Sequence, residues 1–252
     1  MAITVTTILF FVVFFSGLAL FVLKKADKQY VKLLIAFSGA YLLALVILHL
    51  LPEIYEHHIS NIGYFILGGF LLQILLEFFS EGLEHGHIHH HGHKLPYAMF
   101  ISLCIHSFIE AMPLSGGWAI EHTNSAIEHS HSHSADLITK PMLIGIVLHK
   151  IPITLVLMTM LMNVHASKAK SILWLVIFAA MAPLGALASW GLIQFSIAPG
   201  QEFYTQLLGI VCGIFLHVST TILFESSENH RFSVYKFITI ILGIILAIIT
   251  IH

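Results

Sequence analysis

HSFIE, at residues 106–110, places a histidine and a glutamate one helical turn apart inside an apolar segment, residues 96–114. HKIP, at residues 149–152, lies in a second apolar segment, residues 141–163. Ionisable side chains are costly in hydrocarbon, and they persist there mainly where they face one another, water or a bound ion. An imidazole beside a carboxylate on one helix face suits zinc and related divalent metals. The two segments therefore predict a helical membrane protein that handles a metal ion inside the bilayer.

The composition places the whole chain in a membrane. Of its 252 residues, 58% are hydrophobic and 10% are charged, and the mean hydropathy is +0.92. A soluble domain carries about 25% charged residues. The net charge of −2 gives no reason to expect a nucleic-acid partner. Cys104 and Cys212 lie in apolar runs, which argues against a disulfide framework or a thiolate zinc site.

Eight apolar stretches are long enough to cross the hydrocarbon core, which takes about 20 residues of helix. We expect an all-α protein with a single transmembrane domain over residues 1–252. The first stretch is interpreted as a helix rather than a cleaved signal, because no basic segment precedes it and lysines follow it. The expected spans are 5–23, 32–52, 62–80, 96–114, 141–163, 170–194, 203–224 and 233–250.

Basic residues are concentrated on one side of these spans. Nine lie in or beside the odd-numbered loops, Lys140 lies on the other side, and Lys150 lies inside a span. The positive-inside rule then predicts cytoplasmic odd-numbered loops and both chain termini outside. If the source is prokaryotic, the membrane is the cytoplasmic (inner) membrane. The nine are Lys24, Lys25, Lys28, Lys32, Lys94, Lys168, Lys170, Arg231 and Lys236.

The chain has nineteen histidines, and many fall in two tracts on opposite sides of the membrane. Loops that mix histidine with glycine or serine offer many loosely held imidazoles. We expect weak, exchanging metal capture at both ends of a pathway, whereas the alternative is a solvated loop of biased composition. The cytoplasmic loop, about 82–95, carries His85, His87, His89, His90, His91 and His93. The outer loop, about 115–139, carries His129, His131 and His133.

The predicted intramembrane metal ligands are His106, Glu110 and His149. The competing interpretation of His106 and Glu110 is a structural hydrogen-bonded pair. Pro152 follows His149 closely, and a proline removes a backbone hydrogen bond and bends a helix. Such irregular backbone is tolerated in a membrane where it lines a cavity.

Lys150 lies about ten residues from either end of its span, too deep for its ammonium group to reach the interface. A protonated lysine has three donors and cannot bind a metal. We expect it to pair with Glu110 and to supply a fixed positive charge where a second cation would otherwise sit. The alternative is that Lys150 itself transfers protons.

Three further residues are candidates for the ion route. His49 begins the segment HLLPE, and with Glu53 it predicts an outer vestibule that gathers cations. His217, in the seventh span, either lines the route or bonds a backbone carbonyl. Glu77, at the cytoplasmic end of the third span, fits an exit or an ordinary helix-end charge.

At these residues the chain resembles the ZIP (Zrt/Irt-like protein) family of divalent-metal transporters. The family pattern H-N-x-P-E-G reads HSFIEA at 106–111, and a pattern like H-E-x-P-H reads HKIPI at 149–153. HLLP at 49–52 and MAPLG at 181–185 extend the resemblance over nearly the whole chain. The resemblance implies eight helices in a three-two-three bundle with pseudo-symmetric outer triplets. The fourth and fifth spans would then hold the metal.

Three of the departures from the family patterns bear on the number of metals that the site holds. Ser107 stands where some members have an asparagine that contributes to a second metal position. Lys150 replaces an acidic or amide residue, and Ile153 replaces a histidine or glutamate that would bridge two metals. The departures remove most of a binuclear centre, so the resemblance implies a mononuclear site.

The favoured hypothesis is a transporter that moves zinc, or another divalent ion, toward the cytoplasm, with the metal as substrate and no tightly bound cofactor. Its partners would be the lipid bilayer and, as one option, a second copy in a homodimer. A second hypothesis is an intramembrane zinc hydrolase, with His106, His149 and His217 as ligands and Glu110 as base. A third is a membrane metal sensor or scaffold that no longer transports, which Lys150 and Ile153 motivate.

Overall fold

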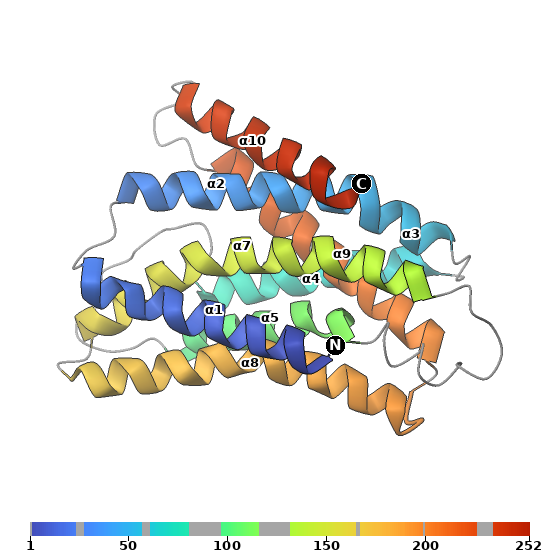
Figure 1. Cartoon of the computed structure of the whole chain (residues 1–252), viewed down its shortest axis with the longest axis horizontal. Helices are drawn as coiled ribbons and strands as arrows, with labels where there is room; N and C mark the ends of the chain where they lie inside the picture. Colours follow the sequence, from blue (N-terminus) through green and yellow to red (C-terminus); the bar gives the residue numbers. More distant parts are fainter. Residues whose placement is uncertain are drawn as a thin grey trace.

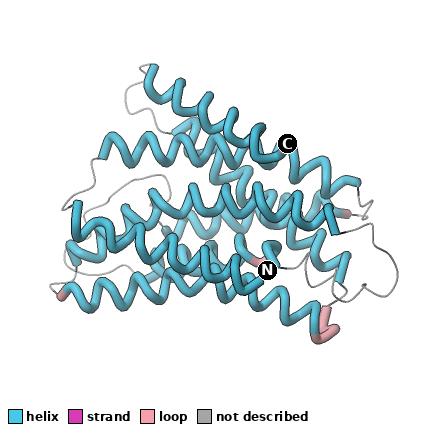
Figure 2. The backbone as a smooth tube through the Cα atoms, viewed as in Figure 1, coloured by secondary structure: helices cyan, strands magenta, loops and turns pink. Residues whose placement is uncertain are grey.

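The computed structural model describes residues 2–23, 28–56, 61–80, 97–115, 132–164, 167–198, 200–225 and 234–252. These residues are nearly all helical, as Figures 1 and 2 show. The expected all-α class is therefore confirmed. The helices are α1 (Ala2–Leu23), α2 (Lys28–Leu45), the π-helix η1 (Val46–Leu50), α3 (Leu51–Glu56), α4 (Ile62–Ser80), α5 (Tyr97–Ala111), α7 (Ser132–Val164), α8 (Lys168–Gln194), α9 (Gly200–Glu225) and α10 (Val234–Ile251).

Within the described ranges, eight helices are long and apolar enough to cross a membrane. Each coincides with one of the eight expected spans, and α2, η1 and α3 together form the second, Gln29–Glu56. Most ends differ from the expected ones by a few residues. The chain is therefore an integral, multi-pass membrane protein.

The fifth span begins earlier than the hydropathy pattern predicts. The outer histidine-rich loop was expected to reach residue 139, but α7 already begins at Ser132. A helix is held by backbone hydrogen bonds and needs no apolar side chains, so hydropathy locates the apolar length of the span and not the start of the helix. His133 consequently lies within α7.

Helix pairing brings distant parts of the chain together. α4 packs along α9 and α2 packs along α10, while α5 packs along α8 and α1 along α7. The first, second and third spans can be exchanged in order with the sixth, seventh and eighth, and the fourth with the fifth. The α4–α9 pair then becomes the α10–α2 pair, and the α5–α8 pair becomes the α7–α1 pair. Pseudo-symmetric triplets require such a pattern, and the three-two-three grouping itself stays a prediction.

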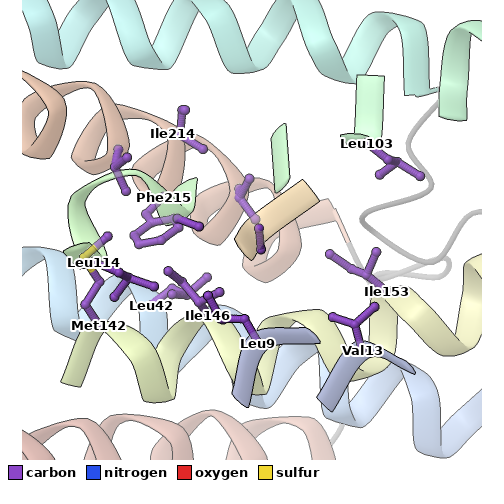
Figure 3. Close-up of a cluster of buried hydrophobic side chains, with 14 of the residues drawn as sticks. Leu9, Val13, Leu42, Leu103, Leu114, Met142, Ile146, Ile153, Ile214 and Phe215 are labelled. Carbon is purple, nitrogen blue, oxygen red and sulfur yellow. The ribbon is translucent and has the colours of Figure 1, made fainter. Parts of the chain in front are cut away.

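The apolar core lies where α1, α2, α5, α7 and α9 meet. Figure 3 shows Leu9 of α1 near Leu42 of α2, Ile146 of α7 and Phe215 of α9, and Val13 of α1 beside Ile153 of α7, all members of one buried cluster. Among the eight spans, α4 and α10 are the least buried within the protein. Their apolar outer faces suit contact with lipid.

At several helix contacts a glycine leaves room for the backbone of the neighbouring helix, and two of these contacts involve α4 and α5. A Cβ at Gly185 of α8 would meet the backbone oxygen of Phe108 in α5. A Cβ at Gly213 of α9 would likewise meet the backbone oxygen of Ile66 in α4. Small residues allow such close helix approach in membranes. Both contacts position helices that carry polar side chains.

The second span widens into a π-helix at Val46–Leu50. The backbone N–H of Leu51 donates to the carbonyl of Val46, five residues earlier. Pro52 follows directly and has no N–H to donate, which already weakens the regular helical ladder there. π-Turns are frequent at functional sites, and this one contains His49.

Candidate metal site

His106 and Glu110 lie on one face of α5 and are both buried, with relative exposures of 3% and 0%. Their facing atoms, His106 Nε2 and Glu110 Oε2, are 3.2 Å apart. The helical spacing of four residues produces this juxtaposition directly. An imidazole and a carboxylate are thus held together inside the membrane-spanning part of the protein.

Gln73 of α4 orients the His106 ring. Its side-chain oxygen Oε1 lies 2.8 Å from His106 Nδ1, and Gln73 is fully buried. An amide oxygen only accepts hydrogen bonds, so His106 Nδ1 carries the proton and donates it. Nε2 is the ring nitrogen that faces Glu110, and once deprotonated it can offer its lone pair to a metal. Metal-binding histidines usually make such a bond through the second ring nitrogen.

Lys150 of α7 forms the ion pair with Glu110 that its depth in the span predicts. The ammonium nitrogen contacts Glu110 Oε1, so the two carboxylate oxygens have different neighbours. Lys150 Nζ also donates to Ser107 Oγ at 2.8 Å and lies 5.4 Å from the centre of the Phe178 ring. These contacts fix a buried positive charge against one side of Glu110.

His149 lies next to this group on α7 and is 1% exposed. Its ring centre is 6.1 Å from that of His106, and the two rings are inclined at 68°. Across the described ranges, no three histidine, cysteine, aspartate or glutamate side chains are gathered closely enough to hold a metal ion. The structure brings His106 and Glu110 together, and the role of His149 as third ligand stays a prediction.

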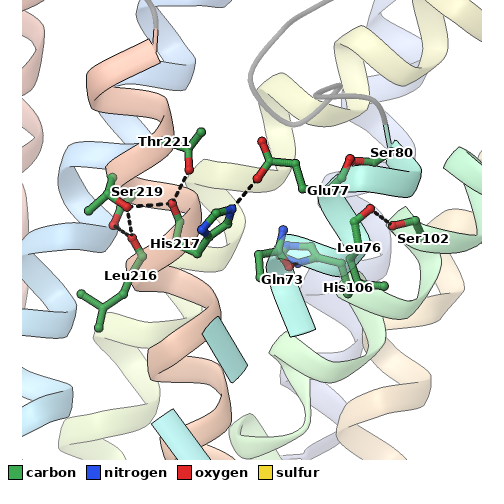
Figure 4. A network of polar contacts seen from close by, with 11 residues as sticks. Gln73, Leu76, Glu77, Ser80, Ser102, His106, Leu216, His217, Ser219 and Thr221 are labelled. Carbon is green, nitrogen blue, oxygen red and sulfur yellow. Dashed lines mark hydrogen bonds and ion pairs between the residues drawn. The ribbon is translucent and has the colours of Figure 1, made fainter. Parts of the chain in front are cut away.

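A second polar pair lies between α4 and α9. His217 Nε2 contacts Glu77 Oε2, as Figure 4 shows, and Phe70 packs edge-on against the His217 ring at 5.0 Å. Glu77 is one helical turn beyond Gln73, which itself bonds His106. Polar side chains therefore extend from His217 across α4 to the buried site. The route-lining role of His217 and Glu77 stays a prediction.

Of the remaining predicted residues, the structure describes His49, Glu53, Ser107 and His133. His49 and Glu53 are half-buried on the second span, where η1 and α3 contact α9. Ser107 is 1% exposed and accepts the Lys150 hydrogen bond. His133 lies within α7. The other predicted tract histidines lie outside the described residues; they are His85, His87, His89, His90, His91, His93, His129 and His131.

Gln73 and Phe178 contact the site although no sequence pattern predicted them. Gln73 was missed although it is an amide inside the apolar stretch 62–80, four residues before Glu77, which is a signal of an inward-facing polar stripe. Phe178 was missed because an aromatic residue in an apolar span gives no signal of its contact with Lys150.

Comparison with known proteins gives one family. The model described as the ZIP zinc transporter matches residues 95–250, more than half of the chain, and this range contains both α5 and α7. No curated protein matches the chain.

Proposed function

This chain belongs to the ZIP zinc transporter family, and on that premise we propose that it carries one zinc or similar divalent ion per cycle toward the cytoplasm through a site between α5 and α7. His106, Glu110 and His149 are the ligands in this proposal, and water completes the coordination. Membership of the family supports divalent-metal transport in general. The location of the site, the single ion that it holds and the direction of transport are the specific parts of this proposal.

The distance between His106 Nε2 and Glu110 Oε2 is the observation that carries the proposal. Zinc binds nitrogen and oxygen at about 2.0–2.2 Å in tetrahedral sites, which separates two ligand atoms by about 3.3 Å. The observed 3.2 Å matches that spacing. The Gln73 bond leaves the Nε2 lone pair directed at the same place.

Transport begins, in this proposal, at an outer vestibule near His49 and Glu53, where cations gather and lose part of their water. The ion then passes to His106, Glu110 and His149. Release follows toward the cytoplasmic histidine tract, past Glu77 and His217. The orientation derives from the charge distribution, which predicts both termini outside and, for a prokaryotic source, an inner-membrane location.

The test is uptake of radioactive zinc into proteoliposomes. Glu110→Gln removes the charge while keeping the size of the side chain, so uptake should be lost. Thr205→Val is the matched control, because Thr205 is fully buried on α9 and bonds only its own helix at Gln201 O in the described contacts. Both variants should elute as folded protein. Normal uptake by Glu110→Gln would refute the pathway.

The sensor hypothesis keeps one specific support, the Lys150–Glu110 ion pair, because that contact occupies one oxygen of the predicted ligand. Zinc that binds the purified protein but never crosses the bilayer would favour it. The hydrolase hypothesis is less well supported, since the contact of His217 is with Glu77, between α4 and α9, rather than with His106 or His149.

A further inference from the structure

We infer that Lys150 balances the charge of the metal-free site, so that the transporter resets without carrying a second ion and works as a uniporter. The inference rests on the proposed function, because it assumes a carrier that alternates between metal-loaded and metal-free forms. It assigns Lys150 a positioning role in the transport cycle rather than a role as a ligand.

The first step is the charge at the site. Glu110 and Lys150 are 0% and 2% exposed, and they are in direct contact. Among the buried residues that the structure describes, these two are the ones with fixed opposite charges. Their sum is zero. A buried carboxylate whose partner has been removed is strongly disfavoured.

The second step is that Lys150 and a metal use different atoms of Glu110. Lys150 contacts Oε1, whereas Oε2 faces His106 Nε2. A metal ion between Oε2 and Nε2 therefore leaves the ammonium group in place. Ser107 and the Phe178 ring also contact that group, the first by a hydrogen bond and the second by a cation–π contact.

The third step is the cycle. With His106 and His149 neutral, the metal-free site carries no net charge, and the loaded site carries the two charges of the metal. The loaded form crosses with those charges, and the neutral metal-free form returns alone. Without Lys150, the returning form would be a bare buried carboxylate, which needs a cation to accompany it.

Two modes of zinc flux distinguish crossing of the metal-loaded form from return of the metal-free form. Net uptake into zinc-free proteoliposomes requires return of the metal-free site, whereas exchange of external labelled zinc for internal unlabelled zinc does not. Both modes are measured with the same buffer and pH on the two sides and with the membrane potential clamped at zero. The wild type should run in both modes.

Lys150→Gln keeps a donor for Ser107 but removes the charge. It should lower the ratio of net uptake to exchange by roughly tenfold or more, because one buried charge is left unpaired only in the returning form. Lys150→Arg keeps the charge and should preserve that ratio. An unchanged ratio in Lys150→Gln, or loss of exchange together with net uptake, would overturn the inference.

A measurement on the wild type keeps the inference falsifiable if Lys150→Gln fails to fold. With two charges per zinc, a tenfold zinc gradient should be balanced by a membrane potential of about 30 mV. Imposing a pH gradient should leave that balance point unchanged. A shift of the balance point with pH would show a coupled proton and overturn uniport. Absence of wild-type zinc flux in either mode would instead refute the proposed function.

Discussion

Replacing Gln73 with leucine should weaken zinc binding, because Gln73 decides which nitrogen of His106 carries the proton. In the structure Nδ1 donates to Gln73 Oε1 at 2.8 Å, and Nε2 faces Glu110. Without this acceptor, the ring prefers to place its proton on Nε2 and donate to Glu110 Oε2, 3.2 Å away. Nε2 then has no lone pair to offer a metal.

The expected magnitude follows from the cost of reversing that tautomer. Zinc binding to Nε2 in Gln73→Leu would leave a buried Nδ1–H without its partner, which costs about 1–3 kcal/mol. At about 1.4 kcal/mol per tenfold, the affinity should fall roughly 5- to 150-fold. At other metal-binding histidines, loss of the hydrogen bond made by the ring nitrogen that does not bind the metal lowers metal affinity by about 10- to 100-fold, which is the same range.

The assay is competition for zinc between the purified protein and a fluorescent chelator. The variant should be made in a background that lacks residues 85–93 and the outer-loop histidines, so that loose imidazoles do not mask the site. Gln206→Leu on α9 is the matched control, because Gln206 is bonded to Glu202 of its own helix. Thermal unfolding should be compared for both variants. A zinc affinity for Gln73→Leu within about twofold of the parent would refute the tautomer argument.

Three further predictions concern flux and stoichiometry. Zinc uptake should decline as the pH falls, because the imidazole and carboxylate must be deprotonated to bind metal; initial rates at several pH values, with equal pH on both sides, test this, and a flat profile would contradict the ligand set. Deleting residues 85–93 should reduce or deregulate uptake without abolishing it, and complete loss in the same assay would show that the tract is more than a loose acceptor. The protein without either histidine tract should bind one zinc at the transport site, and a clear stoichiometry of two by elemental analysis would refute the mononuclear site.

The eight spans and the contacts of Glu110 could be predicted from the sequence because they depend on local properties of single spans or on the need to pair a buried charge. The eight spans follow from the length of apolar helix needed to cross a bilayer, and this local property survives any arrangement of the helices. The His106–Glu110 contact follows from their spacing on one helix. The Lys150–Glu110 contact could be inferred because a deep ammonium group needs a partner, and few are present.

The rest of the site depends on packing between helices, which no local pattern encodes. Gln73 bonds a residue 33 positions later in the chain, and that contact exists only because α4 packs against α5. The contact of Phe178 with Lys150 likewise exists only because α8 packs against α7. The π-turn at Val46–Leu50 is also invisible in hydropathy, because the turn changes the helix path and not the composition.

Lys150 also bears on how tightly such a site can hold its metal. A transporter must release what it binds, so an affinity as high as that of a structural zinc site would stop the cycle. The ammonium group contacts the same carboxylate whose second oxygen faces His106. The Lys150 ammonium group and a metal ion on the same carboxylate are both positive, and they repel strongly in a buried environment where water does not screen them. In the proposed site, Lys150 would thus offset part of the attraction between the metal and Glu110 while remaining in place, and release would be faster. A tighter but slower-releasing site is accordingly expected when its charge is removed, and zinc dissociation rates of Lys150→Gln and Lys150→Arg provide the comparison: faster dissociation from Lys150→Gln would contradict this account.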